Sequence, residues 1–207
     1  MMGYFFNIDN HSGNSFVWYD LIENALSTNS FKHVERYVEK KRHAWFQTGV
    51  NENYNSCDEP IRKSKGCYLA DEETFSTPDE LVPVYAEISN IIEDVNNRYW
   101  KYNIRGWEPM QYFNYDVGDH FTWHIDTEPT PQKDTQRKIS FSLGISHAHE
   151  YEGGDLEFIM GGHNPIKLKL RKNDMVVFNS FLLHRVTPIT KGTRKSLVGF
   201  VHGPNFV

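Results

Sequence analysis

Residues 115–126 read YDVGDHFTWHID, and this stretch decides the fold and the chemistry expected of the chain. Gly118 permits a tight turn that would strain most other residues. The residues that follow are expected to form a short strand. His124 and Asp126 lie two positions apart, so on an extended segment their side chains point to the same face. The sequence therefore predicts a strand end that presents an imidazole and a carboxylate together.

A second histidine and an arginine complete the pattern downstream. His184 follows the apolar stretch MVVFNS at residues 175–180, and Arg194 lies ten residues later, after turn-forming residues 188–192. Two imidazoles and one carboxylate that leave one side of a metal open are the ligand set of non-haem Fe(II) oxygenases. We expect the strands carrying His184 and Arg194 to be adjacent and antiparallel. Arg194 would then lie beside the metal, where its guanidinium can hold the far carboxylate of a chelating 2-oxo acid.

Composition limits the classes of protein to which the chain can belong. Its 207 residues, 39% of them hydrophobic, suffice for a single domain (1–207) with a sizeable core. The net charge of -5 and the pI of about 6.0 give no reason to expect nucleic acid or a membrane as partner. No apolar run approaches the roughly 20 residues of a membrane span, and no signal peptide is recognisable. We therefore expect a cytoplasmic protein, with Cys57 and Cys67 as reduced thiols.

The apolar pattern changes near residue 100. Before it, residues 1–100 are expected to form a supporting region that is mainly helical. Apolar residues at steps of three and four between Leu81 and Tyr99 predict a long helix, with a capping box at residues 77–80. The other expectations for this region are a first strand within residues 1–17, a short helix in 16–26, a loop at 47–60 and a strand at 61–69. Residues 31–43 are expected to form a helix, or a helix that runs into a strand.

After residue 100, short apolar segments alternate with glycine, proline and asparagine turns. Many short strands at regular spacing are typical of a sandwich or barrel. The fold class expected is therefore mainly β with supporting helices, and the β core occupies residues 101–207.

Three motifs together resemble a known family. They are Tyr115-x-x-Gly118-x-x-Phe121-x-x-His124-x-Asp126, Gly153-Gly154-Asp155-Leu156-x-Phe158 and His184-Arg185-Val186-x-Pro188-Ile189-x-x-Gly192-x-Arg194. This combination resembles the iron(II)/2-oxoglutarate-dependent dioxygenases of the prolyl 4-hydroxylase-like (PKHD-type) branch. The resemblance covers about residues 100–203 and implies a double-stranded β-helix, that is, a jelly-roll or cupin-like core.

The resemblance also implies roles for particular residues. His124, Asp126 and His184 would be the catalytic iron ligands, and Arg194 would anchor the C5 carboxylate of 2-oxoglutarate. The cofactors implied are Fe(II), 2-oxoglutarate and O2, with ascorbate as a stimulant. Arg194 differs from the lysine that is usual in collagen-type enzymes and fits bacterial members better.

A tyrosine that contacts the cosubstrate in some members of the family is missing from the strand after Asp126. Ser140, Ser142 or Tyr115 could supply that hydroxyl, and Tyr115 and Ser142 are taken as cofactor-binding candidates.

The function expected is hydroxylation of a C–H bond, with a prolyl or other amino-acid residue of a peptide or protein as substrate. Two alternatives are a small-molecule oxygenase with the same site and a non-enzymatic cupin-like module that binds a metal or sugar. The pair His147 and His149 would suit the latter but is more typical of a surface loop. Arg62 and the loops at 47–60 and 127–136 are candidates for substrate contact. The substrate and the oligomeric state are left open.

Overall fold

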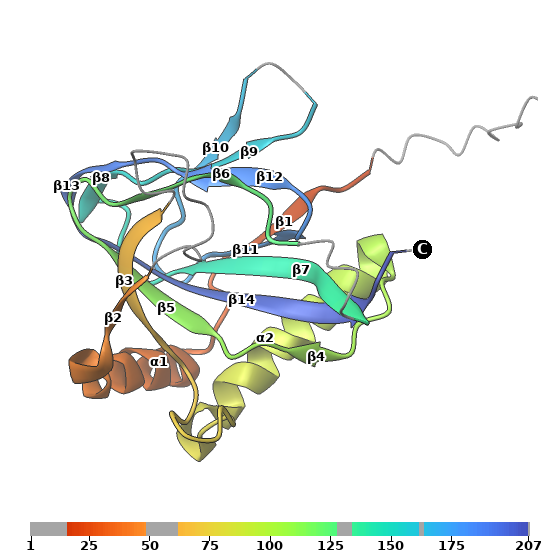
Figure 1. The fold of residues 1–207 in the computed structure, drawn as a ribbon, viewed down its shortest axis with the longest axis horizontal. Coiled ribbons are helices and arrows are strands. Elements are labelled where there is room, and N and C mark those ends of the chain that lie inside the picture. The colour runs from red at the N-terminus through yellow and green to blue at the C-terminus, as the bar shows by residue number, and fades with distance from the viewer. Residues whose placement is uncertain (1–15, 49–61, 128–133, 162–163, 207) are drawn as a thin grey trace, which may run out of the picture.

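Antiparallel strands curl into two facing layers, and two helices cover one of them (Figure 1). The computed structural model describes residues 16–48, 62–127, 134–161 and 164–206. The helices are α1 (Thr28–Lys40) and α2 (Val82–Val95). The strands in chain order are β1 (Tyr19–Ile22), β2 (Phe46–Thr48), β3 (Arg62–Tyr68), β4 (Gly106–Trp107), β5 (Gln111–Tyr115), β6 (His120–His124), β7 (Thr135–Gly144), β8 (Tyr151–Gly153), β9 (Leu156–Ile159), β10 (Ile166–Leu168), β11 (Met175–Asn179), β12 (Leu183–Val186), β13 (Ile189–Gly192) and β14 (Arg194–Pro204).

Strand β3 joins the two layers. The larger layer has the order β1-β11-β7-β14-β5-β3, and the pairing continues through β6-β12-β9-β10 in the smaller layer. At one end of β3, Gly66 lies opposite Phe113 of β5, and at the other end Arg62 lies opposite Phe121 of β6. The result is the mainly β, jelly-roll arrangement that the sequence predicts, because one curled sheet encloses the space between its own layers.

Side-chain alternation gives the larger layer two apolar faces. On β5, Tyr112 belongs to the cluster that packs under the helices, whereas Phe113 and Tyr115 belong to the cluster between the layers. Helix α2 buries Val84, Ile88, Ile92 and Val95, a stripe with helical spacing. The helices therefore cover the outer face of the larger layer, and its inner face is left to form a cavity.

The start of α2 differs from the prediction. A 3-10 turn, η2 (Asp79–Leu81), precedes the helix, and Leu81 is the N-cap without a side-chain cap hydrogen bond. The capping box predicted at residues 77–80 is therefore wrong. Pro78 is extended (φ -61°, ψ 142°), and Pro83 lies in the first turn of α2, where its missing N–H costs nothing. A π-helical turn, η3 (Asn96–Trp100), follows α2 and ends at Lys101, whose φ is 55°.

The first hundred residues supply strands as well as helices. The helix predicted at residues 16–26 is wrong, because Tyr19–Ile22 pairs with β11 instead. Helix α1 begins after it, where Ser27 caps the helix by accepting the backbone N–H of Ser30 at 3.2 Å. The strand predicted at residues 61–69 is confirmed as β3. Residues 47–48 continue β2, and the rest of the loop predicted at 47–60 lies outside the described residues, as do residues 1–15 of the first predicted strand.

Two further expectations can be checked against the described residues. Cys67 is a buried free thiol in the core, and burial raises its pKa to about 11, so it stays protonated at neutral pH. Cys57 lies outside the described residues. None of the helices in the described ranges is both long and apolar enough to cross a membrane.

The packing of α2 predicts a large effect of one truncation. Ile88 is fully buried between α2 and the sheet, so Ile88→Ala leaves a cavity and should lower the free energy of unfolding by about 2–5 kcal/mol. Glu93→Ala, on the exposed face of the same helix, should change it by less than about 0.5 kcal/mol. Urea unfolding followed by circular dichroism measures both. Equal effects of the two substitutions would contradict this packing.

Candidate active site

Two histidines and an aspartate converge at the edge of the smaller layer. His124 ends β6 and lies opposite His184 of β12. The Nε2 atoms of His124 and His184 each lie 3.5 Å from a carboxylate oxygen of Asp126. One ligand atom from each residue lies within 4.8 Å of the other two, so the three side chains could hold one metal ion.

Asp126 reaches this position from a loop, not from the strand. Strand β6 ends at His124, two residues earlier. The backbone N–H groups of Asp126 and Thr127 both donate to the carbonyl of Ser180, at 2.8 and 3.1 Å. The prediction that an extended strand carries both His124 and Asp126 is therefore correct for His124 only, and Ser180 fixes the turn that brings Asp126 back.

Backbone carbonyls orient both imidazoles. Nδ1 of His124 lies 2.8 Å from the carbonyl of Thr122, and Nδ1 of His184 lies 2.8 Å from the carbonyl of Leu182. A carbonyl only accepts, so this geometry fits the tautomer with its proton on Nδ1. Nε2 then presents a lone pair toward Asp126, which is the state that a metal-binding histidine needs.

Burial and charge favour the same protonation states. Burial lowers the pKa of His184 to about 4, although the Asp126 carboxylate opposes this change. Burial alone raises the pKa of Asp126, but His184, His124 and Ser140 outweigh it, so the pKa lies well below its usual range. At neutral pH, His184 is therefore neutral and Asp126 is ionised, as metal binding requires.

Arg194 lines the same cavity from the opposite layer. It begins β14 opposite Tyr115 of β5, and only 4% of its surface is exposed. Its guanidinium lies 5.4 Å from the centroid of the Tyr115 ring and donates to Ser196 Oγ at 3.0 Å. Tyr115 and Ser142 also line this cavity. All six predicted site residues therefore meet in one place.

The predicted route to Arg194 is wrong. Strands β12 and β14 are not neighbours, because β12 pairs with β6 and β9, whereas β14 pairs with β4, β5 and β7. Between them β13 pairs with β8 in a separate ribbon. Arg194 meets the histidines because the two layers face each other across the cavity.

Of the three hydroxyls considered for the cosubstrate, Ser140 is engaged elsewhere. Its Oγ lies 2.9 Å from Ser180 Oγ, and it also hydrogen-bonds Asp126. Tyr115 and Ser142 stay the candidates.

Sequence reasoning missed a polar cluster behind Asp126. Arg137 donates to both carboxylate oxygens of Glu108, at 2.7 and 2.6 Å, and to the backbone carbonyl of Asp126 at 3.3 Å. Nε2 of His202 lies 2.5 Å from the same Glu108 carboxylate. These residues come from distant segments, and no local spacing relates them. Their effect is to hold the turn that carries Asp126.

Other residues singled out in the sequence do not join the site. His147 and His149 are exposed on a turn, as expected of a surface loop. Tyr112 is buried in the core under the helices. Trp123 is half-buried, with the Arg185 guanidinium 4.6 Å from its ring. Only residues 127 and 134–136 of the predicted 127–136 rim are described.

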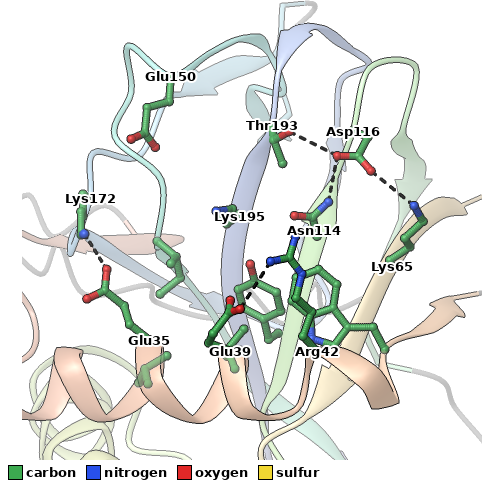
Figure 2. Close-up of a pocket in the computed structure, with 15 residues that line it drawn as sticks. Glu35, Glu39, Arg42, Lys65, Asn114, Asp116, Glu150, Lys172, Thr193 and Lys195 are labelled. Carbon is green, nitrogen blue, oxygen red and sulfur yellow. Dashed lines mark hydrogen bonds and ion pairs between the residues drawn. The ribbon is translucent and has the colours of Figure 1, made fainter.

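A larger cavity lies elsewhere in the described residues. Its volume is about 780 Å³, and it lies between α1 and the outer face of β3, β5 and β14 (Figure 2). Three ion pairs join six of its charged groups: Lys172 with Glu35 at 2.6 Å, Lys65 with Asp116 at 3.5 Å and Arg42 with Glu39 at 3.4 Å. It contains none of the three converging ligands, so the narrower cavity between the layers is the candidate active site.

Comparison with known proteins agrees with this geometry. Residues 110–202 match the family model of the 2OG-Fe(II) oxygenase superfamily, where 2OG is 2-oxoglutarate. This part of the chain, just under half of its length, is similar to that superfamily. The match contains every one of the six predicted site residues.

Curated relatives and solved structures extend the comparison. A PKHD-type hydroxylase of Gloeothece citriformis is 38% identical over 92 residues, 44% of this chain and 41% of the relative. One of a Janthinobacterium strain is 32% identical over 126 residues, 56% of this chain and 54% of the relative. The aligned part of this chain thus spans about half or less of these relatives.

Among solved structures, a Pseudomonas putida prolyl-4-hydroxylase superposes with a TM-score of 0.68 at 16% identity, covering 90% of this chain and 93% of that one. A Trichoplax adhaerens prolyl hydroxylase in complex with a hypoxia inducible factor peptide fragment gives 0.67 at 18%, covering 88% and 82%. The expected double-stranded β-helix fold is confirmed.

The cluster behind Asp126 predicts a pH-dependent contribution to stability. Burial alone raises the pKa of Glu108, but hydrogen bonds from His202 and Arg137 lower it to about 2, below the ordinary value of 4.5. A lowered carboxyl pKa stabilises the fold above pH 4.5, and this stabilisation is lost as the pH falls toward 2. Glu108→Gln should therefore be less stable than the parent at pH 7, with the difference shrinking between pH 4.5 and 2. Urea unfolding across this range measures it, and a pH-independent difference would contradict the account.

Proposed function

We propose that this chain is a dioxygenase that depends on Fe(II) and 2-oxoglutarate and hydroxylates a C–H bond of a prolyl or other amino-acid residue in a peptide or protein. The observation that carries the proposal is the convergence of His124, Asp126 and His184 in a cavity that also holds the buried Arg194. The match of residues 110–202 to the superfamily model and the hydroxylase names of the relatives support it.

The three converging side chains fit a ferrous ion. Two neutral imidazole nitrogens and one carboxylate oxygen are the donor set of open-sided Fe(II) sites in oxygenases. His124 and His184 would each bind through Nε2, because a backbone carbonyl engages Nδ1, and Asp126 would bind as the ionised carboxylate. When bound, iron and 2-oxoglutarate supply the coupled chemistry in which O2 converts the oxo acid to succinate and CO2 and hydroxylates the substrate.

Arg194 would hold the cosubstrate. Its guanidinium is buried and has a hydroxyl partner in Ser196, but no carboxylate partner among the described residues. A bidentate pair with the C5 carboxylate of 2-oxoglutarate satisfies that cation. Ser142 and Tyr115 are the hydroxyls placed to assist, because they line the same cavity.

Apolar side chains would keep this chemistry dry. The remaining wall of the cavity is formed by the following buried or half-buried residues: Phe113, Phe121, Phe141, Leu156, Phe178, Val186, Val198 and Phe200. Their effect is to exclude bulk water from the reacting atoms, which strengthens every charge interaction in the cavity.

The partner proposed is a peptide or protein, since solved neighbours include prolyl hydroxylases. A small-molecule substrate in the same site is the alternative within enzymes. In a non-enzymatic metal-binding module, the buried Arg194 would have no carboxylate to bind. Stimulation by ascorbate, a cytoplasmic location and the absence of a nucleic-acid partner stay predictions.

Loss of one ligand should abolish the metal complex. We expect the parent, titrated without oxygen with Fe(II) and 2-oxoglutarate, to develop the weak visible charge-transfer absorption of an Fe(II)–2-oxo-acid chelate. His184→Ala should not develop this absorption, because the two remaining ligands, His124 and Asp126, do not hold the ion in the geometry of the chelate. His149→Ala is the control, since His149 lies on an exposed turn. A folded parent without the absorption would refute the proposal.

Loss of the Arg194 side chain should weaken the binding of 2-oxoglutarate and leave the binding of Fe(II) nearly unchanged. Arg194→Ala removes a charge-assisted pair, which corresponds to a roughly 10- to 100-fold weaker affinity for 2-oxoglutarate. Fe(II) binding, followed by tryptophan fluorescence, should change little. Arg194→Lys should recover part of the affinity, because it restores the charge without the bidentate geometry. Unchanged 2-oxoglutarate affinity in Arg194→Ala would assign the anchor to another residue.

A further inference from the structure

A second arginine lines the candidate active site. Arg62 begins β3, and its guanidinium lies 3.8 Å from the centroid of the Phe113 ring and 4.7 Å from that of Phe121. The Phe121 ring in turn stacks on the imidazole of His124, with 3.5 Å between centroids. Arg62 therefore lies one aromatic ring away from the proposed iron ligands.

The Arg62 cation has no acidic partner in the described part of the chain. Its Nε is buried and makes no hydrogen bond. The two lysines on the same strand are different, because Lys63 pairs with Asp119 at 3.3 Å and Lys65 pairs with Asp116 at 3.5 Å. Stacking on aromatic rings compensates a cation for lost hydration only in part.

Stacking on a ring does not by itself explain why Arg62 lacks a carboxylate partner in the described residues. Four other arginines that stack on rings in the described residues each pair with a carboxylate: Arg42 with Glu39, Arg98 with Asp94, Arg137 with Glu108 and Arg185 with Glu157. The stacked arginines without such a pair, among the residues described, are Arg194 and Arg62, and both line the candidate active site. Arg194 is already the proposed anchor of a carboxylate.

The sum of charges in the cavity, once Fe(II) and 2-oxoglutarate are bound, also leaves Arg62 without a partner. Asp126 is the one acidic residue among the described residues that line it, and Arg62 and Arg194 are the bases. Adding Fe(II) and the dianion 2-oxoglutarate brings two positive and two negative charges. One positive charge is then uncompensated, and Arg194 is matched by the cosubstrate, so the unmatched cation is Arg62.

We propose that Arg62 binds a carboxylate of the substrate and thereby selects an acidic substrate. This inference rests on the proposed function and adds the substrate class. The carboxylate is either an Asp or Glu side chain next to the hydroxylated position or the free carboxylate of that residue. The planar guanidinium, close to two rings, can pair with such a group in the bidentate way.

Matched pairs of acid and amide probes test this assignment. The probes are N-acetylproline against N-acetylprolinamide, and N-acetylglutamate α-amide against N-acetylglutamine α-amide. Binding to the anaerobic Fe(II)–2-oxoglutarate complex is followed by the change in its visible absorption. Binding to the metal-free protein is followed by the shift in Tm. Each pair differs in one negative charge, so the ratio of the two affinities reports recognition of the carboxylate.

The expected result is selective loss of that ratio. In the parent, at least one acid probe should bind about tenfold more tightly than its amide, and Lys63→Gln, which removes a charge from the same strand, should keep this ratio. Arg62→Gln should bring the ratio to about one while 2-oxoglutarate affinity and Tm without probe stay unchanged. Arg62→Lys should retain part of the preference, which a purely structural role does not predict.

Three outcomes would overturn the assignment: no preference for either acid probe in the parent, a preserved preference in Arg62→Gln, or weaker 2-oxoglutarate binding in Arg62→Gln. The last would make Arg62 part of the cosubstrate site. Failure of the proposed function is recognised separately, because the parent then lacks the Fe(II)–2-oxoglutarate absorption. The Tm measurements on metal-free protein still report on Arg62 in that case.

Discussion

An ionised carboxylate buried beside two imidazoles is the constraint on which this structure depends. Asp126 is buried and its pKa lies well below the ordinary value, so the fold must supply compensating contacts. The contacts on its carboxylate come from His124, His184 and the Ser140 hydroxyl. Without a metal ion such an arrangement is expensive. The cost is understandable when the group is kept ionised for a cation that it binds.

The curl of the sheet follows from the same requirement. The groups proposed to act on one small ligand come from β6 and β12 in one layer and from β5, β7 and β14 in the other. A flat sheet would leave them far apart. Strand β3 makes the closure possible, because it pairs with β5 at one end and with β6 at the other (Figure 1). The helices support this shape from outside by covering the opposite face of the larger layer.

Local sequence patterns predicted the residues of the candidate site more completely than they predicted the fold. His124, Asp126 and His184 were predictable from residue types and spacing, and Arg194 from its motif, because ligand chemistry restricts both. The existence of α2 was predictable from its apolar period. The start of that helix was not, since Pro83 and η2, not a side-chain cap, determine it.

Structural features that depend on contacts between residues far apart in the sequence could not be predicted from local sequence patterns. Strand β1 has four residues, and its partner β11 lies about 150 residues away, so no local signal distinguishes it from a short helix. The cluster of Arg137, Glu108 and His202 likewise exists only after β4, β7 and β14 come together. The same limit explains the wrong route to Arg194, which reaches the site across the cavity and not along a hairpin.

Arginine side chains without a carboxylate partner distinguish the candidate active site from the larger cavity better than volume does. The large cavity under α1 is rich in charged groups, yet its four acids and four bases balance in number, and three ion pairs join six of them (Figure 2). The narrow cavity between the layers holds fewer charges, but Arg62 and Arg194 lack carboxylate partners among the described residues. A protein surface can carry paired charges at little cost, whereas an unpaired cation against apolar walls is costly, and in a cavity it favours a ligand of opposite charge. By that criterion the proposed iron ligands, the proposed cosubstrate anchor and the arginine proposed to bind substrate form one unit, and the large cleft lies outside it.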